Sequence, residues 1–86
     1  MNIFLYLQYA MNWIAYIDEK MIHQDVYLLN HNLVYRYDHK ANRYYARSKN
    51  WTTGKTSPEY SVDYVSWNSY GLYGGEEITK EEYENY

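Results

Sequence analysis

Residues 33–48, LVYRYDHKANRYYARS, decide the fold, because β-branched and aromatic side chains recur there with a period of two on both sides of a short polar loop. A period of two is typical of strands that are buried on one face. If Asp38 faces Arg43 across the loop of residues 39–42, the flanking runs pair as an antiparallel hairpin. The segment therefore predicts strands over residues 33–37 and 43–48.

Alternation gives this hairpin two different faces. The apolar face is expected to join the core, and it carries Leu33, Tyr35, Tyr37, Tyr44 and Ala46. The opposite face is basic and aromatic, and it carries Val34, Arg36, Arg43, Tyr45 and Arg47. We expect its arginines to lie exposed together. They are either balanced by the acidic C-terminal segment or form a contact surface for phosphate or an acidic partner.

Residues 1–22 predict a helix, because apolar residues follow a 3-4 spacing along them. This stripe consists of Ile3, Leu7, Ala10, Ile14, Ile17 and Met21. A second, aromatic stripe runs beside it and consists of Tyr6, Tyr9, Trp13 and Tyr16. Since one thin sheet is too small to cover both, we expect the aromatic stripe to contact a second copy or a partner. The alternative to a helix over residues 1–22 is two short strands, over residues 3–9 and 13–17. The sequence has no turn signal between these two segments.

Further strands are predicted on both sides of the hairpin, over residues 26–29 and 60–67. Residues 50–59 are polar and contain the only proline, which predicts the longest loop. Residues 68–75 contain three glycines and predict a second flexible stretch.

The C-terminal segment opens with a capping box. Thr79 is the expected N-cap and Glu82 follows three residues later, so a short helix is expected to begin there. Together these elements predict a single α+β domain over residues 1–86. Its N-terminal helix packs on a small antiparallel sheet of three to four strands, and a short helix ends the chain.

Composition and charge narrow the range of possible functions. The chain has 14 tyrosines, no cysteine and a net charge of −3. Residues 36–55 hold six basic residues against one acidic residue, whereas residues 56–86 hold seven acidic residues against one lysine. We therefore expect an acidic patch at the C-terminal end, formed by Glu76, Glu77, Glu81, Glu82 and Glu84.

Three classes of function lack support in the sequence. The histidines, His23, His31 and His39, are eight residues apart, which matches no usual metal-ligand spacing. No nucleophile motif or converging pair of acids is present, so neither an enzyme nor a cofactor is expected. The apolar start of the chain lacks a basic segment and a cleavage site, and it is too short to span a bilayer. We therefore expect a cytoplasmic protein without membrane contact.

Two hypotheses for function follow. The first is a protein-binding module, since Tyr and Trp supply large, rigid contact areas. In size and composition the chain resembles the small proteins by which phages disable host defence nucleases, anti-CRISPR proteins among them. This resemblance implies an acidic inhibitor that occupies the nucleic-acid channel of a host enzyme. The alternative is direct nucleic-acid binding through the hairpin, with Tyr45 stacking on bases and arginines meeting phosphates. The net negative charge argues against that alternative.

Overall fold

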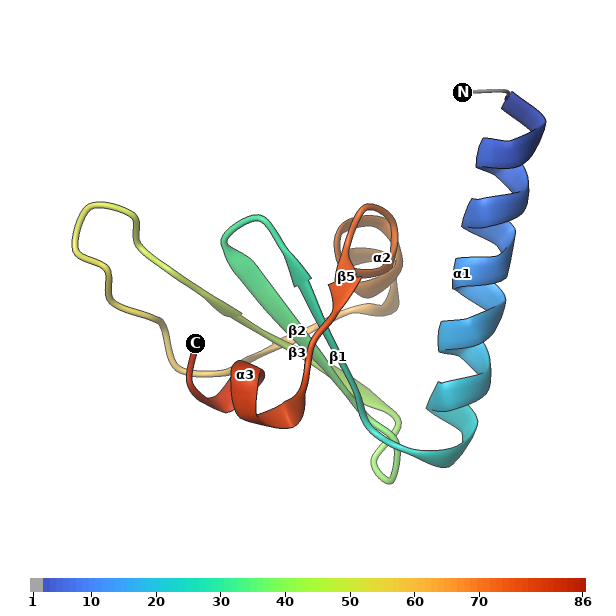
Figure 1. Ribbon diagram of the computed structural model, residues 1–86. Helices are drawn as coiled ribbons and strands as arrows, with labels where there is room; N and C mark the ends of the chain where they lie inside the picture. Colours follow the sequence, from blue (N-terminus) through green and yellow to red (C-terminus); the bar gives the residue numbers. More distant parts are fainter. Residues whose placement is uncertain (1–2) are drawn as a thin grey trace.

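The computed structural model describes residues 3–86, apart from the side chain of Tyr6, and it has an α+β architecture (Figure 1). The helical elements in this part of the chain are α1 (Ile3–His23), α2 (Tyr64–Ser66), the π-helical turn η1 (Trp67–Leu72) and α3 (Lys80–Glu84). The strands are β1 (Val26–Asn30), β2 (Leu33–Asp38), β3 (Arg43–Ser48), β4 (Tyr60–Val62) and β5 (Glu76–Glu77). They form one antiparallel sheet in the order β4-β3-β2-β1-β5.

The predicted hairpin is confirmed in its register. Asp38 pairs with Arg43 and Tyr35 pairs with Ala46, as the alternation of the two strands requires. The turn before β2 needs only two residues, because β1 continues to Asn30, which pairs with Leu33. His31 has a φ of 56° there, a left-handed conformation that tight hairpin turns demand.

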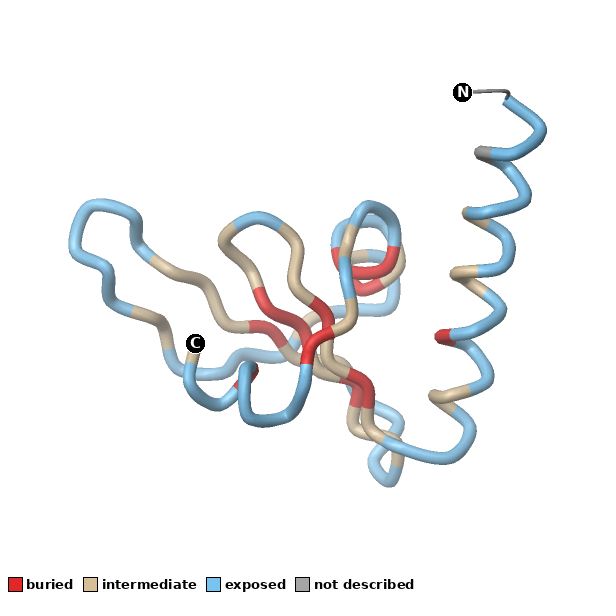
Figure 2. The backbone as a smooth tube through the Cα atoms, viewed as in Figure 1, coloured by how far each residue is buried: buried red, intermediate tan, exposed pale blue. Residues whose placement is uncertain are grey.

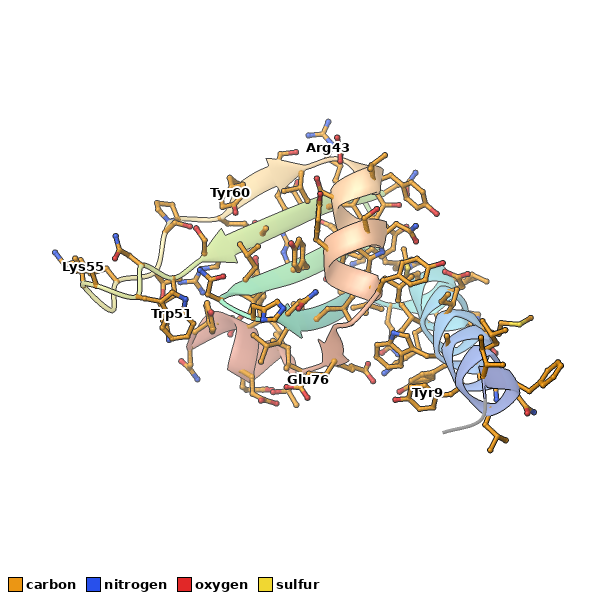
Figure 3. All side chains as sticks on the ribbon, turned by 90° about the horizontal axis from the view of Figure 1, so that it is seen from above. Tyr9, Arg43, Trp51, Lys55, Tyr60 and Glu76 are labelled. Carbon is orange, nitrogen blue, oxygen red and sulfur yellow. The ribbon has the colours of Figure 1, made fainter. Side chains whose placement is uncertain are left out.

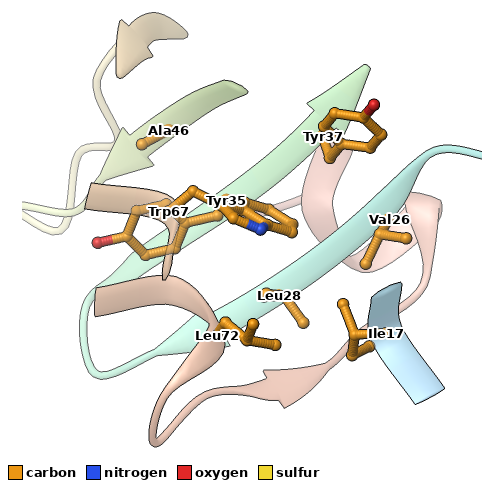
Figure 4. Packing of buried hydrophobic residues seen from close by; sticks show 8 residues of the cluster. All are labelled: Ile17, Val26, Leu28, Tyr35, Tyr37, Ala46, Trp67 and Leu72. Atoms are coloured by element: carbon orange, nitrogen blue, oxygen red, sulfur yellow. The ribbon is translucent and has the colours of Figure 1, made fainter. Parts of the chain in front are cut away.

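The main core lies on the apolar face of the hairpin (Figure 4). Trp67 and Leu72 of η1 pack there over Tyr35, Tyr37 and neighbouring strand residues. Trp67 is 1% exposed, and its ring centroid lies 6.1 Å from that of Tyr37. Ile17 joins this cluster from α1. The π-helical turn η1 therefore covers this face, and α1 adds Ile17 beside it, near β1.

The prediction of a strand over residues 60–67 is wrong beyond Val62. Asp63 ends the strand, because its carboxylate accepts a hydrogen bond of 2.7 Å from the backbone N–H of Ser66 and caps α2. The following residues remain helical as far as Leu72, so the flexible stretch expected over residues 68–75 is also wrong in its first half. The burial of Trp67 and Leu72 outweighs the helix-breaking tendency of Gly71.

The sheet has five strands, whereas three to four were predicted. The additional strand, β5, contributes only two residues, which pair with Leu28 and Leu29 of β1. It leads directly into α3, where both bonds of the predicted capping box are present, between Thr79 and Glu82. α3 packs on the opposite face of the sheet, where Tyr83 and Ile78 enclose Val34 in a second, smaller core.

The predicted N-terminal helix is confirmed over Ile3–His23, but only its inner half is packed. Ile17 is fully buried, whereas Ile3 and Leu7 of the same apolar stripe are 68% and 50% exposed. Figure 2 shows the outer half of α1 extending past the sheet with mostly exposed residues. No helix within residues 3–86 combines the length and apolarity needed to cross a membrane.

Close packing around Gly75 generates a first prediction. A Cβ atom at this position would overlap the carbonyl oxygen of Gly71 and approach that of Leu29. We expect Gly75→Ala to lower the free energy of unfolding by about 2–3 kcal/mol, the upper range for overpacking. Urea denaturation measures this difference.

Gly54→Ala is the matched control, because Gly54 has a φ of 71° but open space around its Cα. We expect it to cost only about 1 kcal/mol, from the left-handed backbone. An equal loss of stability in the two variants would contradict the role assigned to packing at Gly75.

Candidate functional site: a groove between α1 and β5

Three side chains hold the inner half of α1 against η1 and β5. The indole Nε1 of Trp13 donates a hydrogen bond of 2.9 Å to the carbonyl oxygen of Leu72. The hydroxyl of Tyr16 donates to Glu77 Oε1 at 2.7 Å. Lys20 forms a salt bridge with the other oxygen of Glu77 and also donates to the Tyr16 hydroxyl at 3.3 Å. The helix is thus tied to a strand that lies about sixty residues further along the chain.

The pair formed by Lys20 and Glu77 is charged at neutral pH. Burial opposes ionisation of Glu77, but the hydrogen bonds from Lys20 and Tyr16 outweigh it and lower the pKa of the carboxyl group. The hydrogen bond to Glu77 raises the pKa of Lys20 in turn. Glu77 therefore stabilises the contact between α1 and β5, and its charge is already neutralised within the molecule.

A groove of about 350 Å³ opens between α1 and the segment around β5. Trp13 and Ile14 line it as half-buried residues, whereas Tyr9 and Tyr73 are 71% and 50% exposed. Glu76 lines the same groove and is exposed. Figure 3 shows Tyr9 and Glu76 on one side of the molecule and Arg43 on the opposite side. The groove is mainly apolar and has a carboxylate beside it.

The aromatic stripe predicted from the sequence divides into different roles here. Trp13 and Tyr16 bond within the chain, while Tyr9 remains exposed at the groove. The side chain of Tyr6 lies outside the described part of the structure. The sequence pattern pointed to Tyr9, Trp13 and Glu76 but gave no indication that they converge. It missed Tyr73, which lies in the stretch predicted to be flexible.

The predicted acidic patch is also divided. Glu77 is bonded to Lys20, Glu82 accepts the backbone N–H of Thr79, and Glu84 lies 3.9 Å from Lys80. Glu81 is exposed on α3. Within residues 3–86, Glu76 takes part in none of the salt bridges. Its negative charge is therefore open to a positively charged group outside the chain.

The exposure predicted for the basic face of the hairpin is wrong for two of its three arginines. Arg36 is half-buried and makes a two-pronged contact with Glu59, at 3.0 Å and 2.8 Å. Its guanidinium group lies 4.5 Å from the ring centre of Tyr45. Arg43 alone of these arginines is exposed. The face is thus closed by residues that the hairpin sequence does not contain.

Arg47, the other half-buried arginine, supports α3. It donates to the carbonyl oxygens of Tyr83 and Glu84, at 2.8 Å and 3.3 Å. A cation at the C-terminal end of a helix satisfies carbonyl groups that have no partner within the helix. The position of α3 on this face therefore explains why Arg47 is not free.

Glu59 joins these contacts into one network and was missed by sequence analysis. It accepts the hydroxyl of Tyr83 at 2.6 Å as well as both contacts from Arg36. The Arg36 hydrogen bonds lower the pKa of Glu59 against the opposing effect of burial, and the Tyr83 bond lowers it further. Burial and the bond to Glu59 raise the pKa of Tyr83 well above its ordinary value. Glu59 is thus ionised and held in place at neutral pH.

This network generates a prediction for acid stability. Because the pKa of Glu59 in the folded protein lies below its ordinary value of 4.5, its stabilising contribution is complete above that value. The contribution is lost as the pH falls through the lowered pKa. We expect Glu59→Gln to be about 1 kcal/mol less stable than the wild type at neutral pH, and this difference to shrink as the pH falls below 4.5 through the lowered pKa. Urea denaturation across that pH range measures it.

Glu84→Gln serves as the control, because its contact with Lys80 lies at the surface. We expect a smaller difference at neutral pH for this variant. If the difference between wild type and Glu59→Gln were the same at every pH, the ionised carboxylate would not be the stabilising form.

The comparisons with known proteins add no family to this description. Within the described residues, no three His, Cys, Asp or Glu side chains are grouped so that they could hold a metal ion. Four of the predicted partner-binding residues, Tyr9, Trp13, Glu76 and Glu77, line the groove between α1 and β5, and Tyr16 is joined to Glu77 by a hydrogen bond. Searches against protein-family models, curated proteins and solved structures find no match to this chain.

Proposed function

We propose that this protein is a non-enzymatic protein-binding module whose groove between α1 and β5 takes an apolar side chain that lies beside a lysine or arginine of its partner. The observation that carries this proposal is the pairing of an aromatic-lined groove with the open carboxylate of Glu76. In its most concrete form, the module is an inhibitor of a nucleic-acid-handling enzyme, of the phage anti-defence or anti-CRISPR type.

The shape and lining of the groove support an anchor residue. Its volume of about 350 Å³ lies at the lower end of the range for ligand pockets. Tyr9 and Tyr73 offer rigid aromatic surface to a partner at low entropic cost. Trp13 is held by its bond to Leu72, so this side of the groove is organised before a partner binds.

Charge supports the choice of partner. The chain carries a net charge of −3, and Glu76 adds a local negative charge at the groove. Channels that bind nucleic acid are lined by lysine and arginine, and an acidic protein is complementary to them. The alternative, direct binding of nucleic acid through the hairpin, has less support, because Arg36 and Arg47 already have partners within the chain.

A display library of random peptides tests the groove directly. We expect the wild type to enrich peptides in which an aromatic or aliphatic residue lies next to Lys or Arg. Tyr9→Ala should weaken binding of those peptides by about fivefold or more, the loss that corresponds to a contact residue costing more than about 1 kcal/mol. Glu76→Lys should remove the preference for a basic residue. Fluorescence anisotropy with an enriched peptide measures both effects.

Tyr60→Ala and Glu84→Lys are the matched controls, since Tyr60 is 42% exposed at the other edge of the sheet and Glu84 lies on α3. Neither should change binding by more than about twofold, within the usual effect of a remote surface substitution. Equal losses in the controls, or enriched peptides without a basic residue, would contradict the proposed groove.

The inhibitor proposal has its own test. A short DNA duplex should displace the protein from a captured enzyme if the protein occupies the nucleic-acid channel.

A further inference from the structure

The loop between β3 and β4 carries an exposed tryptophan whose ring has no aromatic or cationic partner within residues 3–86. Trp51 is 75% exposed, whereas Trp67 in the core is 1% exposed. Figure 3 shows Trp51 and Lys55 at one end of the molecule and Tyr9 at the other, so this loop is separate from the groove. An exposed indole ring is a typical contact residue for a partner.

Hydrogen bonds within the loop keep it ordered. The side-chain oxygen of Asn50 accepts the backbone N–H groups of Thr52 and Thr53, at 2.9 Å and 3.2 Å. The N–H of Gly54 donates to the carbonyl oxygen of Asn50 at 2.7 Å, and the N–H of Asn50 donates to that of Lys55 at 2.8 Å. The indole ring is therefore presented by an organised loop, which lowers the entropic cost of binding a partner.

The hollow beside this loop is positively charged. It has a volume of about 550 Å³, and Asn32 and polar residues within 48–57 line it. Lys49 and Lys55 are among these described residues, and none of them is acidic. Neither lysine takes part in a salt bridge within residues 3–86. Lys49 lies 4.3 Å from the ring centre of Tyr86, a contact that leaves its charge in place. The hollow therefore suits an anionic group.

The occupant that matches this surface has a flat ring beside an anionic group. Every nucleotide of a single strand offers both, and its base is free to stack on an aromatic side chain. In a duplex the bases are stacked on each other and are out of reach of a surface loop. A bilayer matches less well, because Trp51 is the only large apolar side chain within residues 49–59. An acidic peptide would need a ring at one set position beside its carboxylates, whereas a strand repeats base and phosphate at every position.

We infer that the loop over residues 49–57 binds single-stranded nucleic acid. A base stacks on Trp51, and phosphates lie beside Lys49 and Lys55. This surface differs from the basic face of the hairpin, where two of the three arginines are already bonded within the chain. It also lies beyond the proposed groove and does not depend on it. Because the site is small and the net charge of the chain is −3, the affinity is low and falls with salt.

A titration with single-stranded oligothymidine of about ten nucleotides tests the inference, since this length covers one typical single-strand site. Stacking should quench the fluorescence of Trp51. By anisotropy of a labelled strand, Trp51→Ala should weaken binding at least fivefold, the smallest loss expected for one stacked base. Tyr70→Ala is the matched control, because Tyr70 is 62% exposed but lies on η1, and it should change binding less than twofold. Circular dichroism and thermal melting establish that each variant is folded.

Salt dependence tests the two lysines. For single strands, the logarithm of the affinity falls by about 0.7 per neutralised phosphate for each unit of the logarithm of salt. Two phosphates therefore predict about a sevenfold loss between about 50 and 200 mM salt, and Lys49→Gln or Lys55→Gln should reduce it to about two- to threefold. Lys40→Gln is the control, since Lys40 is exposed in the turn at the opposite end of β3. It should keep the salt dependence of the wild type.

Ligands that lack one half of a nucleotide separate the two contacts. An abasic strand of the same length should bind the wild type at least fivefold more weakly than oligothymidine and should not quench its fluorescence. Three outcomes would overturn the inference. They are a wild type that does not bind oligothymidine at about 1 mM, binding that Trp51→Ala leaves unchanged, and an unaltered salt dependence in both lysine variants.

Two other anionic ligands compete with this assignment. If phosphatidylserine vesicles or polyglutamate bound through Trp51 more tightly than oligothymidine, the loop would belong to a membrane or to an acidic protein, and the inference would be wrong. Peptide binding in the groove is measured separately, and Trp51→Ala should leave it intact. Failure of the loop site and failure of the groove are therefore distinguishable.

Discussion

The indole ring of Trp67 packs on Tyr37 and Tyr44, with ring centroids 6.1 Å and 5.5 Å away, and is 1% exposed. This contact fixes η1 on the sheet, and η1 in turn presents the carbonyl oxygen of Leu72 to Trp13. The position of α1 therefore depends on a residue more than fifty positions away in the sequence. This series of contacts holds α1 beside the sheet, and the groove lies between α1 and the segment around β5.

Local patterns predicted the parts of the fold that local chemistry controls. The alternation of β2 and β3 specified their register, since a slip by one residue would turn Tyr35 and Tyr37 toward the opposite face. The capping box at Thr79 likewise needed only its own four residues. The predicted strand over residues 60–67 was too long because residues 60–62 do form a strand and the alternation continues beyond them. Asp63, a common N-cap residue, already indicates that a helix begins there.

The candidate site was predictable only in its components. Tyr9 and Trp13 attract attention as surplus aromatic residues on a helix, and Glu76 as part of an acidic run. These residues lie at one groove because β5 pairs with β1. β5 has only two residues, Glu76 and Glu77, and their β-sheet propensity does not distinguish them from a loop. Glu59 went unnoticed because a single acid beside a proline carries no pattern, and only the packing of α3 on the hairpin brings Tyr83 to it. The hydroxyl of Tyr83 donates to Glu59 and so serves the fold. Arg36 and Arg47 of the hairpin have partners within the chain, so the number of arginines in the hairpin overstates the positive charge that is free to bind a partner.

The order in which the chain is synthesised gives the anchoring of α1 a consequence for folding in the cell. Two of the hydrogen bonds that dock the helix, from Trp13 and Tyr16, join residues 59 and 61 positions apart. At the usual speed of translation, about 5–20 residues per second, their partners appear roughly 3–12 s after the helix itself. During that interval the inner half of α1 can meet β1 but lacks the hydrogen bonds from η1 and β5 that hold it in place. Residues 64–77 thus determine when the inner half of α1 becomes fixed in its place.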